Sequence, residues 1–278
     1  MYKFTIRGAR GGIPACDSEY LKYGGHTTCF TLETEHGILI IDAGSGLASL
    51  TDELNGRDDL PPIVILFTHF HMDHVLGLPF FDPLYKKGSS ITLMGDPKRE
   101  DSWKGILHTF IATPYWPVPL RDSPADLTLE DLPMHRNGLE LFGARVNWCP
   151  VWHPQQCLAY KIEIPGLSVV VGTDREPGNA EMDGLFLDFI QGCDFLVYDA
   201  EYTPEELDTH RGWGHGTWQD AVQNARAADV GQLILSHHNR RRTDPEIDAL
   251  LAAAQDALPG VRAASQNMVL VDRSENEA

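Results

Sequence analysis

The sequence predicts an α/β protein built from two mixed, largely antiparallel sheets packed face to face, with helices outside them. Strand-like runs rich in Val, Ile and Leu fall into two groups along the chain, with helix-like segments between and after them. The chain has 278 residues and contains no internal repeat, low-complexity tract or Pro/Ser-rich linker. We therefore expect one domain over residues 1–278, which is long enough to bury a sizeable core.

Short apolar runs bounded by Gly, Pro or Asp define the expected strands. Turns around Glu35-His36-Gly37 and Pro165-Gly166 separate neighbouring runs and predict hairpins, so much of the sheet should be antiparallel. Strands are expected at about 2–8, 29–34, 37–42, 63–68, 90–95, 139–149, 157–164, 167–173, 195–199, 232–236 and 267–272.

Helical spacing of apolar residues, together with start signals, defines the expected helices. One segment begins at Thr217, and another begins at Thr243 with Pro245 and Glu246 in its first turn. A hydroxyl residue followed by proline and acid is typical of a helix N-terminus. Helices are expected near 45–54, 73–86, 98–112, 180–191, 204–210, 216–229 and 244–257.

The charge and cysteine content limit the class of protein. The chain has 22 Lys and Arg against 40 Asp and Glu, a net charge of −18 and a pI of about 4.9. General nucleic-acid binders carry a basic footprint, so this class is disfavoured. Five cysteines without C-x-x-C spacing predict reduced thiols and a cytoplasmic setting. We find neither a signal peptide nor an apolar run approaching the ~20 residues of a membrane span.

The most informative segment follows the apolar run 63–67, where four potential metal ligands fall within six residues. His69 and His71 are two apart, so in an extended segment their rings project to the same side. Asp73 and His74 follow at the turn into a helical segment. Imidazole and carboxylate are the ligands expected for Zn²⁺, Mn²⁺ or Fe²⁺. The spacing therefore predicts a metal site that can serve two adjacent cations.

Through this Thr68–His74 motif the sequence resembles the metallo-β-lactamase-fold hydrolases. Within that superfamily it is most similar to the phosphodiesterase branch, which holds ribonuclease Z and the ribose cyclic phosphodiesterase of phosphonate breakdown. The resemblance covers nearly the whole chain and implies a four-layer αββα sandwich. Its other motifs, in the family's order, are the segments 8–14, 23–29 and 40–46.

The resemblance implies two divalent metal ions per chain, with Zn²⁺ favoured and Mn²⁺ or Fe²⁺ open. One ion would take His69, His71, His153 and Asp174, and the other Asp73, His74, Asp174 and His237. His153, Asp174 and His237 each follow an apolar run, so they can emerge at one end of the sheets. Asp42 matches a carboxylate that orients ligands, and His238 stays open as a substitute for His237.

The resemblance also implies a proton donor. The phosphodiesterase branch has a Gly-His-Ser/Thr-Thr segment, assisted by an upstream acid, and this chain has His215 and Asp199 at those places. These two residues and the metal ligand Asp73 form the predicted catalytic set. Arg241, Arg242 and His26 are the candidate substrate-binding residues. Three consecutive arginines are usually a solvated face, and the family pattern has Asn at position 26.

These observations predict a binuclear metal-dependent phosphodiesterase that cleaves a small phosphate diester, such as a cyclic nucleotide or ribose cyclic phosphate. A metal-bridging hydroxide would be the nucleophile. One alternative is a hydrolase of a lactone, thioester or β-lactam-like substrate, and another is an RNA-processing nuclease. The resemblance makes a homodimer plausible. The role of the insertion 96–130, whose aromatic residues pack as core or wall the pocket, stays open.

Overall fold

The computed structural model of the chain describes residues 1–57, 59–97, 102–133 and 138–274. The chain divides into two compact units. The first comprises residues 1–8, 26–134 and 267–278, and the second comprises residues 9–25 and 135–266. Each unit has its own sheet, and the prediction of a single domain over 1–278 stays a prediction.

The first unit is a seven-stranded mixed sheet within the described residues, with the order β14-β1-β2-β3-β4-β5-β6. The strands β14, β1, β2 and β3 pair antiparallel, whereas β3, β4, β5 and β6 pair parallel. The bounds are β1 Tyr2–Gly8, β2 Cys29–Thr34, β3 Gly37–Ile41, β4 Ile63–Leu66, β5 Ser90–Gly95, β6 Asp126–Asp131 and β14 Met268–Arg273.

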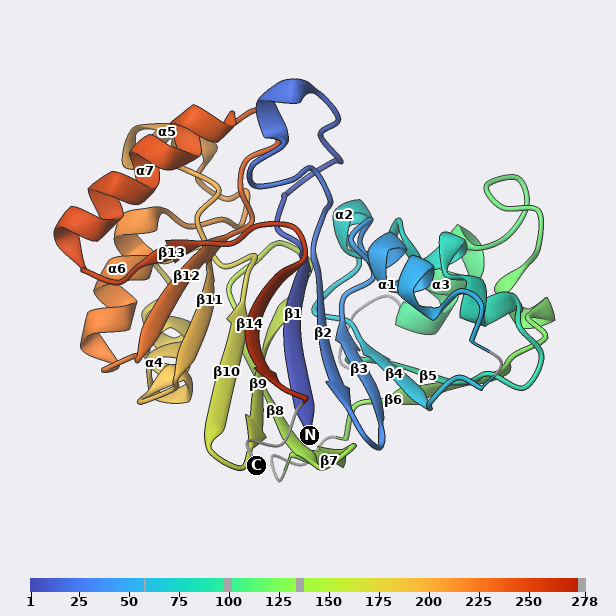
Figure 1. Cartoon of the computed structure of the whole chain (residues 1–278). Coiled ribbons are helices and arrows are strands. Elements are labelled where there is room, and N and C mark those ends of the chain that lie inside the picture. Colours follow the sequence, from blue (N-terminus) through green and yellow to red (C-terminus); the bar gives the residue numbers. More distant parts are fainter. Residues whose placement is uncertain (58, 98–101, 134–137, 275–278) are drawn as a thin grey trace. The chain divides into compact units, whose positions relative to one another are not determined.

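Helices α1 (Leu47–Leu54) and α3 (Trp103–Phe110) lie over β3, β4 and β5 (Figure 1). Their apolar residues form one core cluster with side chains of these central strands. The strands are short apolar runs buried along their length, as expected for the interior of a parallel sheet. This packing fixes the carboxyl ends of β3 and β4, where the predicted ligands begin.

The second unit is also a seven-stranded mixed sheet within the described residues, with the order β13-β12-β11-β10-β9-β8-β7. Strands β7 to β10 pair antiparallel, and β10 to β13 pair parallel. The bounds are β7 Leu139–Leu141, β8 Ala144–Val151, β9 Cys157–Ile164, β10 Leu167–Gly172, β11 Phe195–Asp199, β12 Gln232–Ser236 and β13 Arg262–Ala263.

Helices α4, α6 and α7 pack on this second sheet (Figure 1). Strands β8, β10, β11 and β12 all run in the same direction, because β8 and β10 are each antiparallel to β9. Their carboxyl ends therefore share one edge of the sheet. Thr203, Thr217 and Thr243 precede α5, α6 and α7, each with a capping box. The bounds are α4 Ala180–Ile190, α5 Pro204–His210, α6 Trp218–Ala227 and α7 Asp244–Ala257.

Several expected elements differ from the structure. The helix expected at 73–86 is the short α2 (Met72–Val75) followed by two 3₁₀ turns, each with a proline at its start. Proline lacks the N–H that a continuous helix needs. Residues 98–101 of the helix expected at 98–112 lie outside the described residues. Antiparallel and parallel pairings are equal in number in each sheet, so the antiparallel share is smaller than expected.

Candidate metal centre

In the first unit, the histidine motif leaves β4 and enters α2 with its side chains gathered together. The ring centroids of His69 and His71 are 4.5 Å apart, and those of His69 and His74 are 4.2 Å apart. A carboxylate oxygen of Asp73 lies 3.5 Å from His74 Nε2. His69, Asp73 and His74 are buried, whereas His71 is half-buried. This unit thus brings together the four ligands that the motif predicts.

Asp42, directly after β3, holds the histidine motif in place through hydrogen bonds. The residue is fully buried and adopts a left-handed backbone with φ of 60°. The Thr68 backbone N–H donates to its Oδ1 (2.8 Å), and both the Thr68 hydroxyl and His74 Nδ1 donate to its Oδ2 (2.7 Å each). Burial raises the pKa of Asp42, although the bonds from His74 and Thr68 act to lower it. The arrangement is that of a carboxylate orienting ligands.

These bonds set which ring nitrogen carries the proton. The carboxylate of Asp42 can only accept, so Nδ1 of His74 is the protonated nitrogen. The single hydroxyl proton of Thr68 is used on Asp42, so His69 Nδ1 must donate to the Thr68 oxygen (3.0 Å). Both rings then present the lone pair of Nε2. A neutral imidazole in this tautomer is a metal ligand.

In the second unit, His153, Asp174 and His237 follow β8, β10 and β12. Nε2 of His237 lies 3.2 Å from Oδ1 of Asp174, and its Nδ1 donates to Glu201 (3.1 Å). His153 Nδ1 donates to the carbonyl oxygen of Gly214 (2.8 Å). As in the first unit, each Nδ1 faces a protein oxygen and each Nε2 presents its lone pair. The donor set fits divalent cations of the Zn²⁺ type.

His215 lies beside this second group, at the start of the loop that leads into α6. Its Nδ1 donates to Oδ2 of Asp199 (2.8 Å), and its ring stacks on that of His237 with centroids 4.9 Å apart. Ligand atoms of Asp174, Asp199, His215 and His237 lie within 4.8 Å of one another. Burial acts to lower the pKa of His215, but the charge and hydrogen bond of Asp199 outweigh it, so that pKa is raised.

Asp199 also ties together the backbone around this histidine. It is fully buried at the end of β11, and it accepts hydrogen bonds from the backbone N–H groups of Asp174 (2.9 Å) and Glu201 (3.0 Å). The N–H of Gly216 approaches the same carboxylate at 3.4 Å. Each carboxylate oxygen therefore has a fixed set of donors. A change of this side chain would disturb both the proton-bearing ring and the strand end that carries Asp174.

Residues 38–238 match the family model described as the beta-lactamase superfamily domain. The chain belongs to the beta-lactamase superfamily. Its curated relatives include ribonuclease Z of Clostridium tetani, which is 22% identical over 326 residues and covers 97% of this chain and 98% of the relative. The alignment is longer than this chain of 278 residues, so the relative has segments that this superfamily member lacks.

Two solved structures show the same fold over nearly the whole chain. A zinc-bound PqqB from Methylobacterium extorquens is 17% identical with a TM-score of 0.73, covering 98% of this chain and 100% of that one. A diphosphatase from the PhnP family is 19% identical with a TM-score of 0.68, covering 98% of each chain. These findings confirm the predicted fold class, the superfamily with its phosphodiesterase branch, and the enzyme class, a metal-dependent hydrolase.

Within this superfamily member, the two adjacent histidines after β12 have different surroundings. His237 adopts a left-handed backbone with φ of 55° and directs Nε2 toward Asp174. His238 is buried, its Nε2 bonds the carbonyl of Ala264 (2.9 Å), and its ring packs against Tyr23. Burial lowers the pKa of His238 to about 3. The geometry thus favours His237 as the ligand and gives His238 a packing role.

The candidate substrate-binding residues belong to both units, and each is described within its own unit. In the first unit, half-buried His26 pairs its Nδ1 with the hydroxyl of Ser45 (3.0 Å), and burial lowers the pKa of its ring. In the second unit, Arg241 is exposed, whereas Arg242 donates to Glu206 (2.5 Å) and to the carbonyl of Glu201 (3.1 Å). These bonds give Arg242 a structural role, and its contact with substrate stays a prediction.

Three residues that position the site, Glu201, Arg10 and Glu176, were not identified from the sequence. Glu201 holds His237, and Arg10 is fully buried and donates to the carbonyls of Gly24, Asn239 and Arg242. Glu176 binds the loop that precedes His215. Glu176 and Glu201 each stand two residues past a strand-end aspartate, at 174–176 and 199–201, but this pattern does not say which groups the acids bind.

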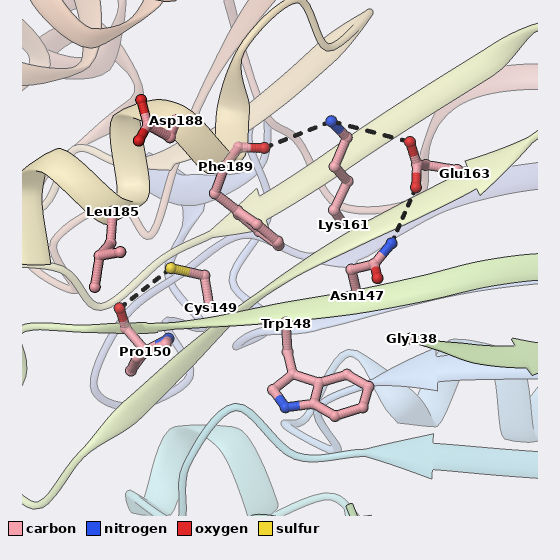
Figure 2. Close-up of a pocket in the computed structure, with 10 residues that line it drawn as sticks. All are labelled: Gly138, Asn147, Trp148, Cys149, Pro150, Lys161, Glu163, Leu185, Asp188 and Phe189. Atoms are coloured by element: carbon pink, nitrogen blue, oxygen red, sulfur yellow. Dashed lines mark hydrogen bonds and ion pairs between the residues drawn. The ribbon is translucent and has the colours of Figure 1, made fainter. Parts of the chain in front are cut away.

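A separate pocket of about 500 Å³ lies in the second unit between α4 and strands β8 and β9 (Figure 2). None of its lining residues is a predicted site residue. Asn147 donates to Glu163 (3.0 Å), and Lys161 lies 4.0 Å from the same carboxylate while donating to the carbonyl of Phe189 (3.5 Å). Its polar groups are thus engaged with one another, and the candidate chemistry lies at the strand ends instead.

Proposed function

We propose that the chain is a binuclear metal-dependent phosphodiesterase that hydrolyses a small phosphate diester, such as a cyclic nucleotide or a ribose cyclic phosphate. The observation that carries this proposal is the Asp199–His215 pair, in which buried Asp199 Oδ2 lies 2.8 Å from Nδ1 of half-buried His215, beside Asp174 and His237. The alkoxide that leaves a diester is a strong base and needs a proton in the transition state. A histidine with a raised pKa, held by a carboxylate, can supply that proton near neutral pH.

The metal ligands in this proposal are those that the resemblance implies. His69, His71, His153 and Asp174 would hold one ion, and Asp73, His74, Asp174 and His237 would hold the other. When bound, divalent ions act as Lewis acids that activate water and neutralise phosphate charge. Zn²⁺ is the proposed metal, because imidazole-rich sites suit it, and Mn²⁺ or Fe²⁺ are the alternatives.

The chain's own residues would supply the remaining chemistry. Asp199 accepts the Nδ1 proton of His215, so Nε2 of that ring holds the proton destined for the leaving oxygen. Asp199 is fully buried and the His215 side chain is only 15% exposed, so bulk water has limited access to this pair. In this proposal Arg241 and Arg242 contact the phosphate, and His26 contacts another part of the substrate. Asp73 acts in catalysis only as a ligand.

An RNA-processing nuclease is the second candidate, because curated relatives are named ribonuclease Z. Two observations favour the small substrate. The net charge of −18 opposes binding of a polyanion over a large surface, and the Clostridium tetani relative has segments that this chain lacks. A lactone, thioester or β-lactam substrate is the third candidate. The Asp199–His215 pair has no obvious task in that reaction.

The proposed setting is the cytoplasm, with a homodimer as the proposed assembly. All five cysteines are free thiols in the structure, which supports a reducing compartment. Among the described residues, no helix is both long enough and apolar enough to cross a bilayer. Light scattering coupled to gel filtration would test the dimer.

The experiment is a substrate panel with the protein loaded with Zn²⁺ or Mn²⁺. The panel holds bis(p-nitrophenyl) phosphate, cyclic mononucleotides, ribose cyclic phosphates, a precursor tRNA and lactones. Turnover of the small diesters, with little dependence on salt, is expected. Absence of diester turnover in the loaded protein would refute the proposal, whereas tRNA cleavage with a steep salt dependence would favour the second candidate.

His215→Ala tests the mechanism directly. The variant should lower kcat for a ribose cyclic phosphate by about 10²–10⁴-fold, because it removes the proton donor. The p-nitrophenolate leaving group needs no proton, so turnover of bis(p-nitrophenyl) phosphate should fall much less. Metal content, measured by atomic emission, should stay that of the wild type. Loss of a metal ion would make His215 a ligand and overturn the assignment.

A further inference from the structure

A buried carboxylate holds the loop that precedes His215. Glu176 is only 5% exposed, and its two oxygens accept hydrogen bonds from the backbone N–H groups of Gly212 (2.9 Å to each oxygen) and Gly214 (2.8 Å). Its own backbone N–H donates to the carbonyl of Trp152 (2.9 Å). Removing a carboxylate from water is costly unless it accepts hydrogen bonds, so these three segments are bound to one another through a single residue.

The loop also has local contacts, because the Trp213 N–H donates to the carbonyl of His210 (3.1 Å) and the two rings meet edge-on with centroids 5.0 Å apart. Gly212 and Gly214 have positive φ values of 86° and 93°, so their N–H groups can face one anion. The residue between them, Trp213, is 62% exposed, so burial of its indole does not anchor the loop. Hydrogen bonds to a charged group are stronger than those between neutral groups. The Glu176 carboxylate is therefore the restraint that joins this part of the loop to the segment after β10.

Two functional rings depend on the position of this loop. The carbonyl of Gly214 accepts the Nδ1 proton of His153 (2.8 Å), which directs Nε2 of that ring outward. The next residue, His215, pairs with Asp199 (2.8 Å). Its ring also contacts that of His153, with centroids 5.3 Å apart. Displacement of Gly214 would move a predicted metal ligand and the predicted proton donor at the same time.

We propose that Glu176 is a positioning residue, which holds the 212–214 loop so that His215 and His153 keep their orientations. The proposal rests on the proposed function, because it assigns Glu176 to the proton transfer through His215. Glu176 itself would touch neither substrate nor metal. With saturating metal, which compensates for weaker ligation by His153, its effect on turnover should therefore follow the need for proton transfer and not the amount of folded protein.

Glu176→Gln is the test variant, because the amide has nearly the same shape but can accept on only one side. Its NH₂ group would face a backbone N–H of Gly212 or Gly214 and push the loop away. At saturating metal, kcat for a ribose cyclic phosphate should fall about 10–100-fold, a part of the full effect of a general acid. Turnover of bis(p-nitrophenyl) phosphate should fall less than about threefold, because its leaving group needs no proton.

Glu246→Gln is the matched control, since Glu246 accepts from the backbone N–H of Thr243 (2.7 Å) in the capping box of α7. This control should lose stability without any selectivity between the two leaving groups. A double-mutant cycle with His215→Ala completes the test. If Glu176 acts through His215, then Glu176→Gln should change kcat for the cyclic phosphate by less than twofold in the His215→Ala background.

The outcomes separate the two proposals. An equal fall for both leaving groups, or additive effects in the cycle, would overturn the positioning role of Glu176. If the wild type hydrolyses no diester, the proposed function fails, and ring ¹⁵N NMR of His153 and His215 then decides the positioning role. Shifts of both rings in Glu176→Gln would support it, and unchanged shifts would refute it. Melting curves of all variants show whether each protein is folded.

Discussion

Asp42→Asn should lower metal affinity by changing the tautomers of two ligands at once. In the wild type, Oδ2 of Asp42 accepts from His74 Nδ1 and from the Thr68 hydroxyl, and this hydroxyl accepts from His69 Nδ1. An amide nitrogen in that place would donate to both partners. His74 and, through Thr68, His69 would then carry the proton on Nε2, where the lone pair for a metal should be.

The cost follows from the bonds that must be broken to restore the ligands. If the amide turns its oxygen toward His74, its NH₂ group faces the Thr68 backbone N–H, which now donates to Oδ1 at 2.8 Å. Leaving one such buried donor unsatisfied costs about 1–3 kcal/mol. Since 1.4 kcal/mol is a factor of ten, metal affinity should fall about 10–100-fold. The removed negative charge would add to this loss.

The assay is competition for Zn²⁺ against a chromophoric chelator at fixed pH. Ring ¹⁵N NMR of the metal-free protein should show the proton of His69 and His74 moving from Nδ1 to Nε2. Asp52→Asn, at an exposed position of α1 in the same unit, is the control and should change neither quantity. Unchanged tautomers, or a metal affinity within twofold of the wild type, would refute the reasoning.

Two further variants test the surroundings of the site and the stability of the first unit. Gly214→Ala should lose metal and activity, because a methyl group there would overlap Nδ1 of His153. Gly212→Ala has a similar positive φ with open space around it, so it should lose only about 1–2 kcal/mol of stability. Equal losses of metal in the two variants would contradict this prediction. Glu53→Gln should lower stability by about 1 kcal/mol at pH 7, because Glu53 is 43% exposed and pairs with buried Arg7. The hydrogen bond from Arg7 lowers the pKa of Glu53 below 4.5, so its contribution exists above pH 4.5 and is lost as pH falls through the folded pKa. The urea midpoints of the two proteins should therefore converge at a pH below that folded pKa, and a constant difference would refute the pairing.

The positions of most strands, and of the candidate ligands that follow them, could be predicted from the sequence because the signals are local. Ile63–Leu66 is an uninterrupted apolar run followed at once by the histidine motif, and β5 (Ser90–Gly95) is bounded by turn residues. The same applies to His237, which follows the apolar strand β12. Where the sequence reasoning went wrong, as at 73–86, it gave apolar periodicity more weight than two prolines.

Glu176, Glu201 and Arg10, which also position the site, could not be predicted, because their partners are distant in the chain. Glu176 binds Gly212 and Gly214 at separations of 36 and 38 residues, and Glu201 binds His237 at a separation of 36. Such bonds depend on the packing of strands and loops, which no local pattern encodes. Arg10 is a similar case, since an arginine in a Gly-rich turn is usually exposed.

Backbone strain is present at three residues to which the chemistry is assigned, out of eight non-glycine residues with a positive φ in the described part of the chain. Asp42, Asp174 and His237 each end or follow a strand, and each has a positive φ of 55–60°. For a residue with a side chain this conformation costs about 1–2 kcal/mol, and Asp and His are among those that tolerate it best. Buried bonds hold it in place: the N–H of Asp42 donates to Leu66, and that of Asp174 donates to Asp199 (2.9 Å each). Glycine would relieve the strain at all three positions, but it has no side chain that could bind a metal or orient a ligand. The left-handed conformation thus occurs where the site needs the side chain, and burial of the strands on either side offsets its cost in stability.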